Sequence, residues 1–220
     1  MRAVVVAHTW IAHELGHLGD WLGARGSAVQ RLDRESLPTP ESLDGADLLV
    51  LMGSPWSVAL PADADVVESQ RRERDLVARA LSDGTPLLGI CYGAQLLASC
   101  VGGEVRRLDV TERGWLDVDA VDPVPTGPWM VWHEDEFTVP PAVEVLASSP
   151  RCTLAFRTGT AWGVQFHPEV DEPVLRRMAE GLGAAPDVVA EMTSGARLHD
   201  AGHRQAAHHL LDAFWSDVRA

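Results

Sequence analysis

A ten-residue stretch, PLLGICYGAQ at positions 86–95, decides the fold. Its apolar run from Pro86 to Ile90 predicts a buried strand. The residues from Cys91 to Val101 predict a helix, because their apolar positions recur on one helical face, and Gly102-Gly103 ends it. A buried strand that runs directly into a helix is the unit from which parallel sheets are built.

The chain before this stretch repeats the same alternation. Ala3–Ala7 and Ala46–Met52 are short apolar runs that predict two further buried strands. Leu15–Ala28 has helical spacing, and Ala64–Ser82 is a charged helical segment rich in Arg and Glu. Repeated strand-helix order predicts an α/β fold with a mostly parallel central sheet and helices on both of its faces.

The chain after residue 104 has a different character. Short apolar segments alternate there with turns that contain Pro and Gly, at residues 118–121, 129–132, 143–147, 154–157 and 161–166. This pattern predicts a small β-rich half. Helices are expected again at Glu172–Leu182 and at about His199–Val218. We therefore predict one domain over residues 1–183 and a C-terminal helical extension over 184–220, packed on the same domain.

The composition excludes several kinds of chemistry. The 220 residues include 18 cationic side chains, all of them Arg, against 32 acidic ones, and the chain contains neither Lys nor Asn. Without Lys, a phosphate-binding P-loop and Schiff-base catalysis are excluded, and without Asn a Cys-His-Asn triad is excluded. A formal charge of −14 argues against a nucleic-acid partner.

The three cysteines and the apolar segments indicate where the protein works. An odd number of cysteines at irregular spacing does not form a disulfide framework, and Cys100 and Cys152 are expected to be small core residues. The first residues lack a signal-length apolar stretch, and no window is long enough to span a membrane. These features predict a soluble, cytoplasmic protein without a membrane partner.

Cys91 lies at the centre of a Gly-x-Cys-x-Gly pattern. A nucleophile on a sharp strand-to-helix turn needs small residues two positions before and after it, and Gly89 and Gly93 meet this requirement. The helix N-terminus lowers the pKa of such a thiol, and the N–H of Tyr92 is a natural oxyanion donor. The alternative is a buried structural cysteine beside two glycines.

A second segment, at residues 162–169, supplies a base for that thiol. In an extended chain His167 and Glu169 project to the same side, and Pro168 stiffens the spacing between them. Glu169 can then hold one imidazole nitrogen while the other faces the sulfur of Cys91. Taken alone, the His-Pro-Glu triplet is also typical of a surface turn.

The two motifs, GICYGAQ at 89–95 and GVQFHPE at 163–169, resemble the signatures of class I (triad-type) glutamine amidotransferases. The similarity is greatest to the glutaminase domain of GMP synthase and its free-standing relatives, and it extends over about residues 1–180. The resemblance implies a flavodoxin-like fold and hydrolysis of a γ-glutamyl amide through a thioester at Cys91. It also implies that His167 is the base and later the acid, held by Glu169.

The same resemblance assigns further residues to the site. Gly53 and Ser54 stand where the family has a Gly-Gly-Pro loop with the second oxyanion N–H, and Ser54 departs from that pattern. A backbone donor survives the change if its φ is open to a residue with a Cβ. Gln95 matches a position that contacts the substrate glutamine. His133 and Asp135 resemble a segment near the α-amino and carboxylate end of the substrate, or else form a capped turn.

A competing motif would make the protein a zinc hydrolase. His13, Glu14 and His17 fit the H-E-x-x-H pattern, in which two imidazoles bind zinc and a glutamate activates water. The motif needs a third ligand such as Glu35 or Glu41, and it falls where a loop enters a helix. The histidines of the C-terminal helix are expected on a solvated face; they are His199, His203, His208 and His209. We therefore predict no metal site and no cofactor.

Three functions follow from these residues. The first is a free-standing amidotransferase subunit that takes L-glutamine and delivers ammonia to a synthase subunit encoded elsewhere. The second is a γ-glutamyl hydrolase that acts alone on a small γ-glutamyl compound. The third is a catalytically silent domain of the same fold that serves as a binding module, against which the presence of Cys91, His167 and Glu169 argues.

Overall fold

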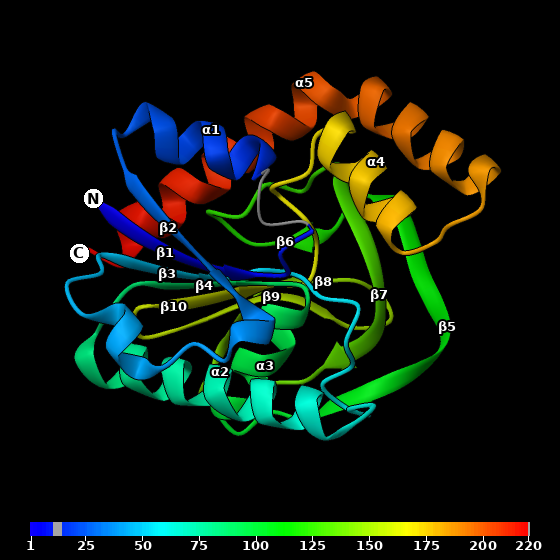
Figure 1. Ribbon diagram of the computed structural model, residues 1–220. Helices are drawn as coiled ribbons and strands as arrows, with labels where there is room; N and C mark the ends of the chain where they lie inside the picture. Colours follow the sequence, from blue (N-terminus) through cyan, green and yellow to red (C-terminus); the bar gives the residue numbers. More distant parts are fainter. Residues whose placement is uncertain (11–14, 220) are drawn as a thin grey trace.

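A central sheet of eight strands organises the computed structural model, which describes residues 1–10 and 15–219 (Figure 1). In spatial order the strands are β2 (Ala28–Asp33), β1 (Arg2–Ala7), β3 (Leu48–Leu51), β4 (Leu87–Ile90), β10 (Ala161–Val164), β9 (Thr153–Thr158), β8 (Glu144–Ser148) and β6 (Asp119–Ala120). The five strands from β2 to β10 pair in parallel, and the remaining three pair antiparallel. The predicted α/β fold with a mostly parallel sheet is confirmed.

Helices cover both faces of this sheet (Figure 1). On one face lie α1 (Gly16–Ala24) and the C-terminal part of α5 (Pro186–Asp217), and on the other lie α2 (Ala64–Asp83) and α3 (Tyr92–Cys100). Successive strand residues point to opposite faces, so Val5 packs under α1 and α5 whereas Val4 packs under α2 and α3. The all-apolar central strands thereby contribute to two separate cores.

The long helix α2 begins and ends where its sequence predicts. The side chain of Asp63 accepts hydrogen bonds from the N–H groups of Asp65 and Val66, which caps the first turn. At the other end Gly84 adopts a left-handed conformation with φ of 69°, and its N–H returns to the carbonyl of Ala80. Both ends of α2 are thus fixed by local contacts, and tertiary packing buries its apolar face.

A two-stranded ribbon and two helices enclose one end of the sheet. The ribbon is formed by the antiparallel strands β5 (Val105–Leu116) and β7 (Trp129–Phe137). Beside it α4 (Glu172–Gly181) packs on the N-terminal part of α5, and both bury apolar residues against Met130 of β7. Two short 3₁₀ helices, Arg34–Ser36 and Pro40–Leu43, follow β2.

The C-terminal helix is longer than the sequence pattern predicted. It begins at Pro186 rather than near residue 199, and proline is well tolerated at this first helical position. Its N-terminal half packs on α4 and its C-terminal half packs on α1. Its apolar residues therefore do not stay on one face along the whole helix. Across the described parts of the chain, none of the helices has the length and apolar character needed to cross a membrane.

Candidate active site

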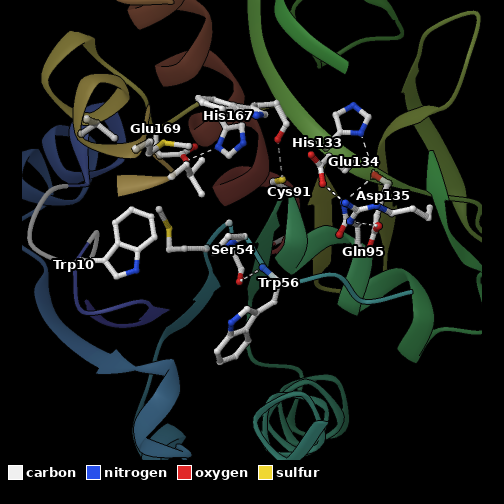
Figure 2. A pocket seen from close by; sticks show the side chains of 18 residues that line it. Trp10, Ser54, Trp56, Cys91, Gln95, His133, Glu134, Asp135, His167 and Glu169 are labelled. Carbon is white, nitrogen blue, oxygen red and sulfur yellow. Dashed lines mark hydrogen bonds and ion pairs between the residues drawn. The ribbon is translucent and has the colours of Figure 1, made fainter. Parts of the chain in front are cut away.

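A pocket of about 280 Å³ opens at the carboxyl ends of the parallel strands. Cys91 follows β4, and Gly53 and Ser54 follow β3, which brings them to the same edge of the sheet. His167 and Glu169 come from the loop after β10 and line the same pocket (Figure 2). Ligands commonly bind at this edge of open α/β sheets.

Cys91 occupies a strained turn between β4 and α3. Its φ of 51° and ψ of −109° are outside the regions that residues with a Cβ prefer. The turn needs both neighbouring glycines: a Cβ on Gly89 would lie 2.6 Å from the carbonyl oxygen of Gly93, and one on Gly93 would lie 2.1 Å from that of Leu51. The Gly-x-Cys-x-Gly pattern therefore forms the predicted sharp turn.

The thiol of Cys91 is surrounded by polar groups. The side-chain amide of Gln165 donates to Sγ at 3.5 Å, and the carbonyl oxygen of Trp132 lies 3.7 Å from Sγ. The residue also stands at the N-terminus of α3, with Tyr92 as the first helical residue. The sulfur of Cys91 therefore has a side-chain amide donor beside it and the N-terminus of a helix next to it.

His167 and Glu169 form a buried pair. His167 Nδ1 donates to Glu169 Oε1 at 2.8 Å, and both side chains are almost inaccessible. Burial alone would lower the pKa of His167, but the Glu169 carboxylate and the Cys91 sulfur raise it well above its usual value. Because Nδ1 is held by Glu169, the other ring nitrogen, Nε2, is left available on the opposite side of the ring.

The side chain of Ser54 makes contacts of its own, separate from the backbone N–H that is predicted to be an oxyanion donor. Its hydroxyl accepts from the N–H of Trp56 at 3.0 Å (Figure 2). The same hydroxyl donates to His8 Nε2 at 2.8 Å, and His8 Nδ1 donates to Glu35 at 2.8 Å. Leu37 and Cys91 are the two non-glycine residues with positive φ in the described ranges, so Ser54 is not strained. The departure from Gly-Gly-Pro is therefore compatible with this loop.

Arg34 is a buried residue under that loop which the sequence analysis did not identify. It donates to the carbonyl oxygens of Met52 at 2.8 Å and Gly53 at 3.0 Å, and it pairs with Glu73 at 2.5 Å. Both charged side chains are fully inaccessible, and the guanidinium lies 4.5 Å from the centre of the Tyr92 ring. No local pattern marks Arg34, because its partners come from three other parts of the chain.

Gln95 and Asp135 lie on the far side of the pocket from Glu169 (Figure 2). The Gln95 amide donates to the carbonyl oxygen of Asp135 at 3.0 Å and to Gln165 Oε1 at 3.3 Å. The Asp135 carboxylate accepts from the Ser57 hydroxyl at 2.7 Å and from the N–H of Val58 at 2.9 Å. Both residues thus hold the pocket wall together in this structure.

His133 and Arg107 also line the pocket, in different ways. The His133 imidazole is buried, and its Nε2 lies 2.9 Å from the carboxylate of Glu112 on β5. The guanidinium of Arg107 is partly exposed and lies 3.4 Å from Asp135. Arg107, which the sequence analysis did not single out, is a cation at the pocket wall.

The competing zinc motif is only partly within the described residues. His13 and Glu14 lie outside them, whereas His17 is buried in α1, with its ring 5.4 Å from that of His203. Glu35, one suggested third ligand, instead accepts from His8. Glu41, the other, lies exposed in the second 3₁₀ helix.

One expectation for the C-terminal histidines is wrong. His203 is 1% exposed rather than solvated, because α5 packs it against α1 and the ring of Trp129 at 5.6 Å. Its neighbour His209 is exposed as expected. The sequence pattern could not show which side of so long a helix meets the domain.

Residues 7–174 match the family model described as glutamine amidotransferase class-I. The chain belongs to this family. It is 34% identical over 182 residues to GMP synthase from Thermus thermophilus, covering 74% of this chain and 33% of that protein. It is 38% identical over 131 residues to GMP synthase from Ralstonia pickettii, covering 48% of this chain and 24% of that protein. The chain thus spans a third or less of these two relatives.

Solved structures show the same fold over nearly the whole chain. A glutamine amidotransferase from Thermotoga maritima superposes with a TM-score of 0.82 at 24% identity, covering 100% of this chain and 99% of that one. One from Methylobacillus flagellatus gives 0.81 at 22% identity, covering 97% and 93%. These two solved structures match the C-terminal helical extension as well as the sheet.

Proposed function

We propose that this protein hydrolyses the γ-amide of glutamine, or of a related γ-glutamyl compound, through a thioester on Cys91. The observation that carries the proposal is the common pocket shared by a strained, amide-contacted thiol and the buried His167–Glu169 pair. Nucleophile, base and orienting carboxylate are the parts that a cysteine-dependent acyl transfer requires.

Each step of the reaction has a residue in this pocket. The Cys91 thiolate attacks the amide carbon, and the N–H groups of Tyr92 and Ser54 stabilise the oxyanion that forms. His167 gives its proton to the leaving nitrogen, which departs as ammonia and leaves the acyl group on sulfur. His167 then takes a proton from water, which attacks the thioester and releases glutamate. Glu169 holds the ring in position throughout.

The remaining pocket residues would hold the amino-acid end of the substrate. Gly53 leaves room beside His167 and Cys91, because a Cβ there would lie 3.1 Å from the imidazole and 3.7 Å from the Cys91 Cβ. We assign Gln95, His133 and Asp135 to the opposite wall, where carbonyl and amide groups can meet a substrate ammonium. Arg107 adds a cation for its α-carboxylate.

The ammonia acceptor is part of the same proposal. Relatives named GMP synthase support a synthase subunit that receives ammonia in trans. The second candidate, a γ-glutamyl hydrolase that acts alone, requires the same Cys91 chemistry and no cofactor.

The experiment that tests the proposal combines labelling with turnover. A glutamine-analogue diazo-ketone should add its mass once, at Cys91, and purified protein should release ammonia from at least one compound in a panel of glutamine and γ-glutamyl amides. Cys91→Ser should lose both properties, whereas Cys100→Ser, a change at a half-buried thiol away from the pocket, should keep them. Labelling at Cys100 or Cys152, or absence of labelling in folded protein, would refute the mechanism.

A further inference from the structure

A second cluster of Cys, His and Glu lies behind the pocket wall. Glu112 of β5 and His133 of β7 are direct partners across the ribbon, and Cys152 comes from the turn before β9. His133 Nε2 is 2.9 Å from Glu112 Oε2, and Cys152 Sγ is 3.7 Å from the same oxygen. All three donor atoms lie within 4.8 Å of one another, and no other group of three such side chains in residues 1–10 and 15–219 is this close together.

The hydrogen bonding of His133 leaves its inner nitrogen without a proton. Nδ1 lies 3.0 Å from the carbonyl oxygen of Asp135, which can only accept, so Nδ1 carries the proton. Nε2 then presents a lone pair to the Glu112 carboxylate, and within the described ranges it has no hydrogen-bond partner. Two such lone-pair atoms 2.9 Å apart are held together by a proton or by a metal ion between them.

Cys152 completes the cluster from a third part of the chain. The Ser149 hydroxyl accepts from the N–H groups of Arg151 and Cys152, each at 3.2 Å, which holds the turn in shape. A metal ion that binds Cys152 displaces the proton of the thiol. The Cys152 side chain is buried, but the Glu112 side chain is 15% exposed, so an ion can reach the cluster from solvent past Glu112.

We propose that Glu112, His133 and Cys152 bind one divalent cation of the zinc type. Thiolate, imidazole and carboxylate are the ligands that zinc takes, and around a tetrahedral ion their donor atoms stand roughly 3.3–3.6 Å apart. The observed spacings reach this geometry with small side-chain movements. The Asp135 carbonyl supplies the outer hydrogen bond that ligating histidines usually make.

Metal binding at this site replaces the thiol proton of Cys152 with the metal ion. The Cys152 S–H bond breaks, its proton goes to solvent, and bonds form from the ion to sulfur, to His133 Nε2 and to Glu112 Oε2, with water in the fourth position. The ion joins β5, β7 and the β8–β9 turn, and so ties the ribbon to the end of the central sheet. The cluster shares His133 with the pocket wall but uses none of Cys91, His167 and Glu169, so failure of the metal site would leave the proposed thioester mechanism intact.

The test uses full-length protein in a Cys91→Ser background, so that the pocket thiol contributes nothing. Zn²⁺ bound after dialysis is counted, and Co²⁺ is added to a second sample to record the thiolate-to-cobalt absorption band. We expect one Zn²⁺ per chain, the cobalt band, and a higher melting temperature with Zn²⁺. A further Cys100→Ser change should leave all three signals unchanged, since Cys100 lies in α3, outside the cluster.

Two further variants separate the proposed site from other metal-binding groups. Cys152→Ala should abolish the cobalt band, and Glu112→Gln, at a partly exposed position, should weaken Zn²⁺ binding at least tenfold while the protein stays folded by circular dichroism. A cobalt band that persists without Cys152, Zn²⁺ binding that is unaltered in both variants, or no Zn²⁺ bound by the parent protein would each overturn the proposal. Metal bound only by the histidines of α5 would give no thiolate-to-cobalt band, and this result would also overturn the proposal.

Discussion

The buried pair of Arg34 and Glu73 leads to a sharp prediction about the oxyanion loop. Arg34 is the donor to the carbonyl oxygens of Met52 and Gly53, the two residues just before Ser54. Replacing it by Met keeps most of the side-chain volume and removes the charge and its hydrogen bonds. The change therefore affects both the stability of the fold and the position of the Ser54 N–H.

The structure allows the cost to be worked out. Removing one partner of a fully buried ion pair costs about 3–5 kcal/mol, because the other charge is left uncompensated. The second change, Glu73→Met, removes that charge. The double variant should then lose only the carbonyl hydrogen bonds, at about 1–3 kcal/mol for each buried group left unpaired. We expect the free energy of unfolding to be lowest for Arg34→Met, highest for the parent, and intermediate for the double variant Arg34→Met/Glu73→Met.

Urea unfolding of the parent, both single variants and the double variant measures these terms, and glutamine hydrolysis is measured in parallel. Recovered stability should not recover activity: kcat/KM should stay at least tenfold below the parent in the double variant, because the loop still lacks its anchor. Arg71→Met is the matched control, since Arg71 makes only exposed ion pairs on α2 and should change neither quantity.

Two results would refute this reasoning. If the double variant is no more stable than Arg34→Met, the buried Glu73 charge is not what the arginine compensates. If the double variant hydrolyses glutamine at the parent rate, Arg34 supports the fold without positioning the loop.

Three other predictions concern the pocket and the C-terminal helix. Glu169→Gln should reduce kcat/KM about 100-fold or more and move the basic limb of its pH profile to lower pH, because the Glu169 charge raises the pKa of His167; an unchanged profile would contradict the assigned role. His8→Phe should reduce kcat about tenfold by releasing Ser54; Ser54→Ala should cause a similar loss with no further loss in the double variant, and additive losses would count against the contact. Burial, with His17 nearby, lowers the pKa of His203 to about 3, so the unfolded state binds a proton below pH 6.5 that the folded state does not. Acidification should therefore cost about 1.4 kcal/mol per pH unit from this residue, and urea unfolding of His203→Leu between pH 6 and 4 should show a shallower slope.

Two strands show where sequence patterns fail. β2 and β5 were not predicted, since none of their residues is fully buried, half are exposed, and neither strand has a one-sided apolar pattern. β2 lies at an edge of the sheet and β5 in a two-stranded ribbon, so their partners, rather than their own side chains, make them strands. The buried strands β1, β3 and β4, by contrast, contain no polar side chain except Arg2 at the start of β1, and they were predicted within two residues.

The sequence by itself determined the local chemistry of the pocket. Gly89 and Gly93 leave room for a sharp turn at Cys91 that a Cβ would block, and His167 and Glu169 are two residues apart, so both arrangements involve residues that are neighbours along the chain. The tertiary structure alone decided which distant groups support them. Arg34 reaches Glu73 across 39 positions and His8 reaches Ser54 across 46, and single polar side chains leave no periodic signal in the sequence. Such contacts form only when the folded sheet brings the carboxyl ends of its parallel strands together.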